Sequence, residues 1–134
     1  MKGYLASIEQ LTEENTKFRQ VLYTGQHLQL VLMTLIPGQD IGRETHATHD
    51  QFFRIEQGSG QIVIDGVTRP VKAGDGIIVP GGAVHNLINS GNQPMRLYTL
   101  YGPPNHIDAL VQATKAEAEA SDEEFDGVPT ETAG

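Results

Sequence analysis

The sequence predicts an all-β domain, a sandwich or barrel of short strands, followed by one short helix. Three observations lead to this prediction. Short segments rich in Val, Ile, Leu and Tyr are repeatedly interrupted by Gly and Pro. The dipeptide Asp65-Gly66 separates two such segments. The composition shifts to Ala, Glu and Lys only after the Pro103-Pro104 pair.

The composition narrows the functional classes. A chain of 134 residues suits one domain. Its formal net charge of -8, without a Lys/Arg cluster, argues against a nucleic-acid partner. The chain contains no cysteine, so disulfides and thiolate chemistry are excluded and any metal must bind nitrogen and oxygen.

The first residues, MKGYLASIEQLTEEN, lack the apolar run of a signal peptide. No window approaches the roughly 18 consecutive apolar residues that a membrane helix needs. We therefore expect a cytoplasmic protein without a membrane partner.

The strands follow from apolar segments and the turns between them. Residues 18–36 predict two strands around a turn at Gly25, with a helix as the competing interpretation. His27 would then lie inside an apolar strand, as a packed core histidine. Asp65-Gly66 predicts a two-residue hairpin, because both central residues of a type I′ turn need positive φ. Later apolar pieces cover residues 77–79, 84–88 and 95–101.

The C-terminal part is predicted to differ from the barrel. Thr114 and Glu117 form a capping box ahead of KAEAEA, which predicts one short helix. The acidic end, SDEEFDGVPTETAG, has too few apolar residues to offset its chain entropy and is expected to be flexible. We therefore divide the chain into a barrel with its N-terminal strands, residues 1–104, and a tail, residues 105–134. His106, at the start of this tail, could cap the barrel mouth.

A second group of residues has the spacing of a binding site. Residues 74–89, GDGIIVPGGAVHNLIN, combine a glycine turn, a short strand, a Pro-x-Gly turn and a histidine. Because alternate residues of a strand share a face, His85 would point with Leu87 and Asn89. By the same rule Glu44 and His46 share a face.

These residues resemble the two motifs of the cupin superfamily. The second motif, G-x5-P-x-G-x2-H-x3-N, is met by Gly74, Pro80, Gly82, His85 and Asn89. The first, G-x5-H-x-H-x3,4-E-x6-G, aligns with Glu44, His46, Gln51 and Gly58, so that a glutamate and a glutamine replace its first histidine and its glutamate. The chain is most similar to small single-domain cupins that carry a mannose-6-phosphate isomerase-like label.

The resemblance covers residues 28–101 and implies a double-stranded β-helix, or jelly-roll barrel. It also implies that one divalent transition metal (Mn, Fe, Zn, Ni or Co) is held by Glu44, His46, Gln51 and His85. Two imidazoles and a carboxylate resemble the two-histidine-one-carboxylate iron site. His49 falls in the turn before Gln51 and is expected at the rim or in solvent. The motif glycines, Gly58, Gly74 and Gly82, are expected to have positive φ.

The preferred functional hypothesis is a metal-binding cupin that takes a small polar organic molecule, a carbohydrate or an oxo-acid. Lewis-acid chemistry of an isomerase or lyase, with Glu44 as catalytic base, would follow. Two alternatives stay open, because fold alone does not fix function. One is a dioxygenase with redox-active Fe or Mn. The other is a non-catalytic module that binds or senses a small ligand such as a sugar.

Two further expectations concern charge and assembly. Arg43 and Arg54 are the cations nearest to the expected site, but Arg54 should face outward, so a phosphorylated substrate lacks a clamp. A homodimer is also expected, with the N-terminal strands pairing across the interface. The apolar segment 28–36 would otherwise leave an open sheet edge, and twofold dimers are common.

Overall fold

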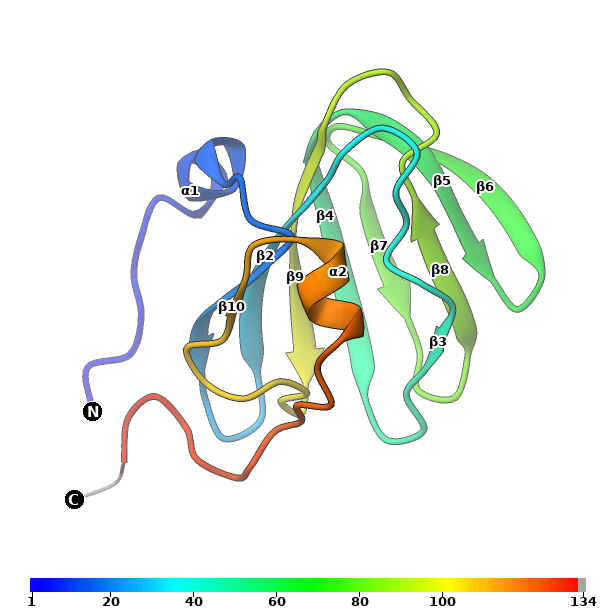
Figure 1. Cartoon of the computed structure of the whole chain (residues 1–134). Helices are drawn as coiled ribbons and strands as arrows, with labels where there is room; N and C mark the ends of the chain where they lie inside the picture. Colours follow the sequence, from blue (N-terminus) through cyan, green and yellow to red (C-terminus); the bar gives the residue numbers. More distant parts are fainter. Residues whose placement is uncertain (133–134) are drawn as a thin grey trace.

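The computed structural model describes residues 1–132 and consists of two antiparallel sheets that face each other (Figure 1). The six-stranded sheet has the order β10-β1-β2-β9-β4-β7, and the four-stranded sheet has the order β3-β8-β5-β6. The all-β prediction is therefore confirmed. The strands are β1 Arg19–Thr24, β2 Gln29–Leu35, β3 Glu44–Thr45, β4 Asp50–Gln57, β5 Ser59–Ile64, β6 Val67–Lys72, β7 Gly76–Val79, β8 Val84–Ile88, β9 Met95–Gly102 and β10 Val111–Gln112.

The predicted turns adopt the expected backbone. Asp65 and Gly66 connect β5 to β6 with φ of 46° and 79°, as a type I′ hairpin requires. Gly58, Gly74 and Gly82 have φ of 88°, 94° and 89°. A side chain is strained in this left-handed region, so glycine is favoured at these corners for a conformational reason.

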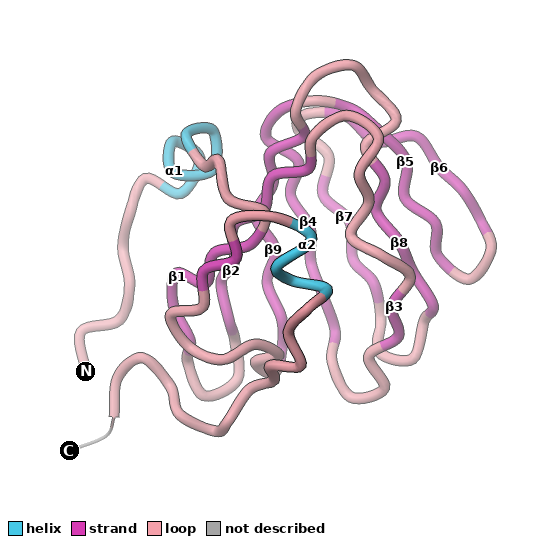
Figure 2. Tube along the Cα trace, in the orientation of Figure 1, coloured by secondary structure: helices cyan, strands magenta, loops and turns pink. Residues whose placement is uncertain are grey.

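The short helix α2, Lys115–Glu119, begins at the predicted cap. Thr114 Oγ1 accepts a hydrogen bond from the Glu117 backbone N–H at 3.2 Å. The Glu117 carboxylate accepts one from the Ala113 N–H at 2.8 Å, one residue earlier than the standard capping box. In Figures 1 and 2, α2 lies in front of β9 and β4 of the six-stranded sheet. Ala118 packs against the core from this helix.

A second helix, α1 at Ile8–Glu14, was not predicted. Its seven residues are too few for stability alone, and the Ser7 side chain makes no capping hydrogen bond. The helix lies against β2, β4 and β9, with Thr12 buried. Tertiary packing, which local sequence does not reveal, therefore accounts for this element.

Two expectations about the N-terminal strands are wrong. His27 is exposed in the turn between β1 and β2 rather than packed in the core, because β2 begins only at Gln29. Strand β2 is not an open edge either, since it pairs with β1 on one side and β9 on the other. Homodimerisation stays a prediction, without the free edge that motivated it.

Polar contacts hold the C-terminal segment where it lies. Glu123 accepts hydrogen bonds from the Ile107 backbone and contacts His106, and the Thr130 N–H donates to the Thr24 carbonyl at 2.9 Å. The Tyr23 hydroxyl donates to Glu131 at 2.5 Å. The division at residue 104 and the flexibility of the tail stay predictions. Among residues 1–132, no helix combines the length and apolarity needed to cross a membrane.

Candidate metal centre

Three strands bring the predicted ligands together at one end of the barrel. Glu44 on β3 is paired directly with His85 on β8, and His46 follows β3 by one residue. Gln51 reaches the same place from β4 in the opposite sheet. The chain turns at residues 47–48, so the four residues between His46 and Gln51 form the expected turn.

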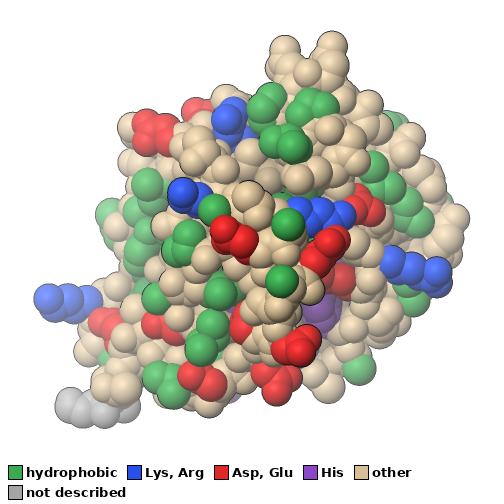
Figure 3. All heavy atoms as spheres, viewed as in Figure 1, with side chains coloured by type: hydrophobic (Ala, Val, Ile, Leu, Met, Phe, Trp, Pro, Cys, Tyr) green, Lys and Arg blue, Asp and Glu red, His purple; other side chains and the backbone are tan. Residues whose placement is uncertain are grey.

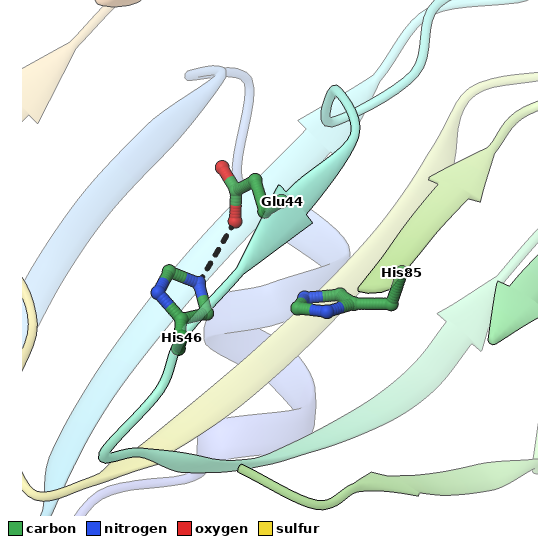
Figure 4. A group of neighbouring side chains, drawn as sticks. All are labelled: Glu44, His46 and His85. Atoms are coloured by element: carbon green, nitrogen blue, oxygen red, sulfur yellow. Dashed lines mark hydrogen bonds and ion pairs between the residues drawn. The ribbon is translucent and has the colours of Figure 1, made fainter. Parts of the chain in front are cut away.

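The side chains of Glu44, His46 and His85 converge (Figure 4). One potential ligand atom from each lies within 4.8 Å of the other two. His46 Nε2 is 3.0 Å from Glu44 Oε2, and Gln51 Oε1 is 3.1 Å from His85 Nε2. The structure thus brings all four predicted residues to one place, and His85 and Gln51 are almost fully buried there.

The hydrogen bonds around His85 indicate what this cluster can hold. His85 Nδ1 is 3.1 Å from the Ala83 carbonyl, so a neutral ring that donates there keeps a lone pair on Nε2. The Gln51 amide N–H donates to Thr99 Oγ1 at 3.0 Å, which turns the amide oxygen toward His85. In that tautomer two lone pairs face each other in a buried space, and a cation would relieve their repulsion.

Such a carbonyl contact is also how a metal-binding histidine is usually oriented. The donor set of two imidazoles, one carboxylate and one amide oxygen therefore fits a divalent transition metal bound through nitrogen and oxygen. The cluster is compatible with a metal site.

Glu44 is poised to be ionised. Its partial burial disfavours the charged form, but the hydrogen bond from His46, the electrostatic interaction with that imidazole and the positive charge of Arg19 outweigh that cost. Together they hold the pKa of the Glu44 carboxyl below its usual value. A negatively charged oxygen is thus available at the cluster at neutral pH.

A buried polar group extends the cluster toward the C-terminal segment. The Tyr101 ring meets the His46 ring edge-on, with centroids 5.8 Å apart. His106 Nε2 is 3.3 Å from the Tyr101 hydroxyl, and His106 Nδ1 is 2.5 Å from Glu123 Oε1. Burial and the Glu44 charge raise the pKa of Tyr101, which keeps the phenol neutral. His106 is thus an interior residue that supports Tyr101.

The remaining histidine lies where the sequence predicted. His49 is half-buried at the rim, and its Nε2 is 3.0 Å from the Pro104 carbonyl. Its ring centroid is 5.7 Å from that of His46, but it does not join the group of converging ligand atoms. In the view of Figure 3, a small patch of histidine atoms is visible near acidic side chains.

The cations around the site agree with the expectation for Arg54, which faces outward, but include Arg19, which was not expected. Arg43 is exposed, and Arg54 faces outward and pairs with Glu56 at 3.0 Å. Arg19, which was not predicted, is 6% exposed and points into the barrel from β1. The sequence could have indicated this burial, because Arg19 lies two residues before Val21 and therefore on the same buried face of the strand. A cavity of about 200 Å³ links it to Glu44. The cavity is lined by Phe18, Arg19, Ile41, Glu44, Lys115, Ala118 and Glu119.

The comparisons with known proteins agree with this architecture. The protein YrkC of Bacillus subtilis is 43% identical over 128 residues, covering 91% of this chain and 69% of YrkC. The crystal structure of BH2720 from Bacillus halodurans has a TM-score of 0.88 and 39% identity, covering 90% of this chain and 96% of that one.

A Klebsiella pneumoniae protein described as having a double-stranded beta-helix domain has a TM-score of 0.65 at 21% identity. It covers 84% of this chain and all of its own, and it supports the predicted fold alone. The family model described as "Cupin domain" matches residues 31–101, which is more than half of the sequence. The chain therefore belongs to the cupin family.

Proposed function

We propose that the protein is a metal-binding cupin that acts on a small polar organic molecule, a carbohydrate or an oxo-acid. Glu44, His46, Gln51 and His85 would hold one divalent transition metal. The observation that carries this proposal is the convergence of the Glu44, His46 and His85 ligand atoms within 4.8 Å, with the Gln51 oxygen facing His85.

The residues around the cluster suit an isomerase-like or lyase-like reaction. When bound, such a metal supplies Lewis-acid polarisation of a carbonyl or hydroxyl group. Glu44, ionised at neutral pH, would accept a proton at Oε1, because Oε2 accepts the hydrogen bond from His46. Ala83 and Thr99 fix the orientations of His85 and Gln51 through their hydrogen bonds. Tyr101 packs edge-on against His46, and Ala118 of α2 lines the cavity beside Glu44.

The test is the metal content of purified protein, measured by elemental analysis together with the affinity for added Mn²⁺ and Zn²⁺. His85→Ala should weaken binding by at least about a hundredfold, because residues that only orient a ligand already contribute about ten- to a hundredfold. Gln51→Ala should have a smaller effect, since a neutral amide is the poorer donor.

His49→Ala is the matched control, because it removes an imidazole that packs edge-on against His46, with centroids 5.7 Å apart, but contributes no atom to the converging group. It should bind metal like the wild type. The proposal fails if the wild type binds no divalent metal, or if His49→Ala loses the metal while His85→Ala retains it.

A further inference from the structure

We propose that Arg19 binds the carboxylate of a small organic acid in the cavity beside Glu44, and that the ligand is therefore an oxo-acid or hydroxy acid rather than a neutral carbohydrate. This inference rests on the proposed function and specifies its ligand. It assigns to Arg19 the role of a specificity-determining residue.

The first observation is that Arg19 is buried without a direct ion pair, although the Glu44 and Glu123 carboxylates are near enough for its charge to lower their pKa values. Its exposed fraction is 6%. The ion pairs within residues 1–132 do not include Arg19. Arginine is rarely buried this deeply unless it is paired, because removing a charge from water is costly. The bound state that best offsets this cost is one in which an anion lies against the guanidinium.

The second observation is the unused hydrogen-bonding capacity of the same group. Nη1 donates to Gln112 Oε1 at 2.8 Å, while Nε is buried and has no partner in the described part of the chain. The guanidinium carbon lies 5.3 Å from the Phe18 ring centroid, so a cation–π contact helps to hold the group in place. A planar fork with a free donor matches the geometry of a carboxylate.

The cavity gives the ligand its size and its second contact. Its volume of about 200 Å³ corresponds to about six or seven waters at roughly 30 Å³ each, which suits a molecule of three or four carbons. Glu44 lines the same cavity, so an acid bound to Arg19 would present its neighbouring carbonyl or hydroxyl to the metal-ligand cluster.

The other charged groups of this cavity already have partners. Lys115 pairs with Asp40 and lies 3.7 Å from Glu119, and Glu44 accepts from His46. Arg19 is therefore the cation of the lining with a free donor. An alternative role is purely structural, in which Arg19 only ties β10 to β1 through Gln112. The two roles predict different ligand selectivities.

The experiment compares pyruvate with hydroxyacetone, which replaces the carboxylate by a CH2OH group. Binding to the full chain is measured by calorimetry, with and without added Mn²⁺, for the wild type, Arg19→Gln and Arg43→Gln. Arg43→Gln makes the same charge change in an exposed residue next to Glu44, at a separate hollow on the outer face of β5 and β8.

The wild type should bind pyruvate at least tenfold more tightly than hydroxyacetone. Arg19→Gln should weaken pyruvate binding by about ten- to a hundredfold, the range expected for a hydrogen bond to a charged group, and leave hydroxyacetone unchanged. Arg43→Gln should behave like the wild type. Equal binding of the two probes by the wild type, or an equal loss in Arg43→Gln, would overturn the inference.

Two further measurements keep the outcome clear. If Arg19→Gln does not fold, Arg19→Lys is used instead, because lysine retains the charge without the planar guanidinium. This variant should lose part of the preference for pyruvate over hydroxyacetone. An undiminished preference would count against the proposal. Metal content is measured in the same samples. Absence of metal would contradict the proposed function. The role of Arg19 would still be decided by two results: whether the metal-free wild type prefers pyruvate to hydroxyacetone, and whether Arg19→Gln loses that preference.

Discussion

The two ends of the barrel interior are built from the same strands but from different kinds of residue. At one end, β2, β9 and β4 pair apolar side chains, with Leu35 opposite Met95 and Leu97 opposite Met33 and Ile55. At the other end the same strands pair Tyr101 with Gln29 and Gln51. All of these side chains are buried.

The change from apolar to polar occurs within a single strand and therefore separates two roles in the same molecule. Burial of apolar surface stabilises the fold, whereas a buried polar group costs free energy unless it is hydrogen-bonded. Each polar residue at this end has a specific partner, as Gln51 has in Thr99 and Gln29 has in Thr24. The apolar end should govern stability and the polar end should govern binding.

The largest effect is expected at the apolar end. Leu97→Ala, at a fully buried position, should lower the free energy of unfolding by about 2–5 kcal/mol, through lost burial and the remaining cavity. Urea denaturation would measure it. Leu100→Ala, on the outer face of the same strand and only half-buried, should cost less. Metal affinity per folded molecule should not change, and a selective loss of metal in Leu97→Ala would contradict the separation of roles.

The next effect separates orientation from stability at the polar end. Thr99→Val keeps the shape of the side chain but removes the acceptor for the Gln51 amide, at a cost of about 1–3 kcal/mol. Metal affinity should fall by about tenfold, because Gln51 loses its orientation. Thr24→Val is the control, since it removes an acceptor from Gln29 outside the cluster. Equal metal affinity in the two variants would show that Thr99 does not orient a ligand.

The polar end should also make stability depend on pH. Burial, the largest cause, lowers the pKa of His106 despite the Glu123 carboxylate. Below about pH 6.5 the unfolded chain then binds more protons than the folded chain, so stability is full above that pH and falls as the pH drops toward the folded pKa. The slope from this group is at most about 1.4 kcal/mol per pH unit.

His106→Asn should flatten the stability curve between about pH 6.5 and pH 5, as measured by urea denaturation of chelator-treated protein. The fall below about pH 4.5 should remain, because the pKa values of Asp40 and Glu44 are lowered and both groups still take up protons on unfolding. Identical slopes for the two proteins between pH 6.5 and 5 would mean that His106 does not titrate in this way.

The smallest effect concerns the helix that covers the polar end. Lys115→Ala removes the partly exposed ion pair with Asp40 and should cost only about 0.2–1 kcal/mol, with a larger cost at low salt. Lys72→Ala, which removes an exposed pair 3.9 Å from Asp75, is the matched control and should cost no more. If Lys115→Ala lowered the free energy of unfolding by more than about 2 kcal/mol, helix α2 would be a main source of stability.

The sequence predicted most of the barrel because its local signals agreed. The Asp65-Gly66 turn, the glycine corners and the cap at Thr114 depend on backbone preferences that neighbouring residues alone determine. The convergence of His46 with His85 was also expected, but from a family resemblance. Their pairing depends on β3 lying beside β8, which no local pattern encodes.

The missed features depend on tertiary contacts. Helix α1 is stabilised by the sheet beneath it, and His27 was misplaced because the apolar run hid the end of β1. Arg19 lies two residues before Val21 and therefore on the same buried face of β1, which was a signal in the sequence, but its unpartnered Nε became evident only when the opposing strands were in place. A charged residue on the buried face of an apolar strand is therefore worth testing in such sequences.

The contacts of Glu131 have a practical consequence. Its carboxylate accepts hydrogen bonds from the backbone N–H groups of Lys2 and Gly3 at 2.6 and 3.0 Å, so the two terminal segments lie together (Figure 1). A short linker could join them, and the chain could be reopened at the exposed Asp65-Gly66 turn to give a circularly permuted protein. Such a permutant would place an affinity tag or a reporter at the β5–β6 turn, where the Asp65 carboxylate accepts a hydrogen bond from the Val84 N–H, next to His85.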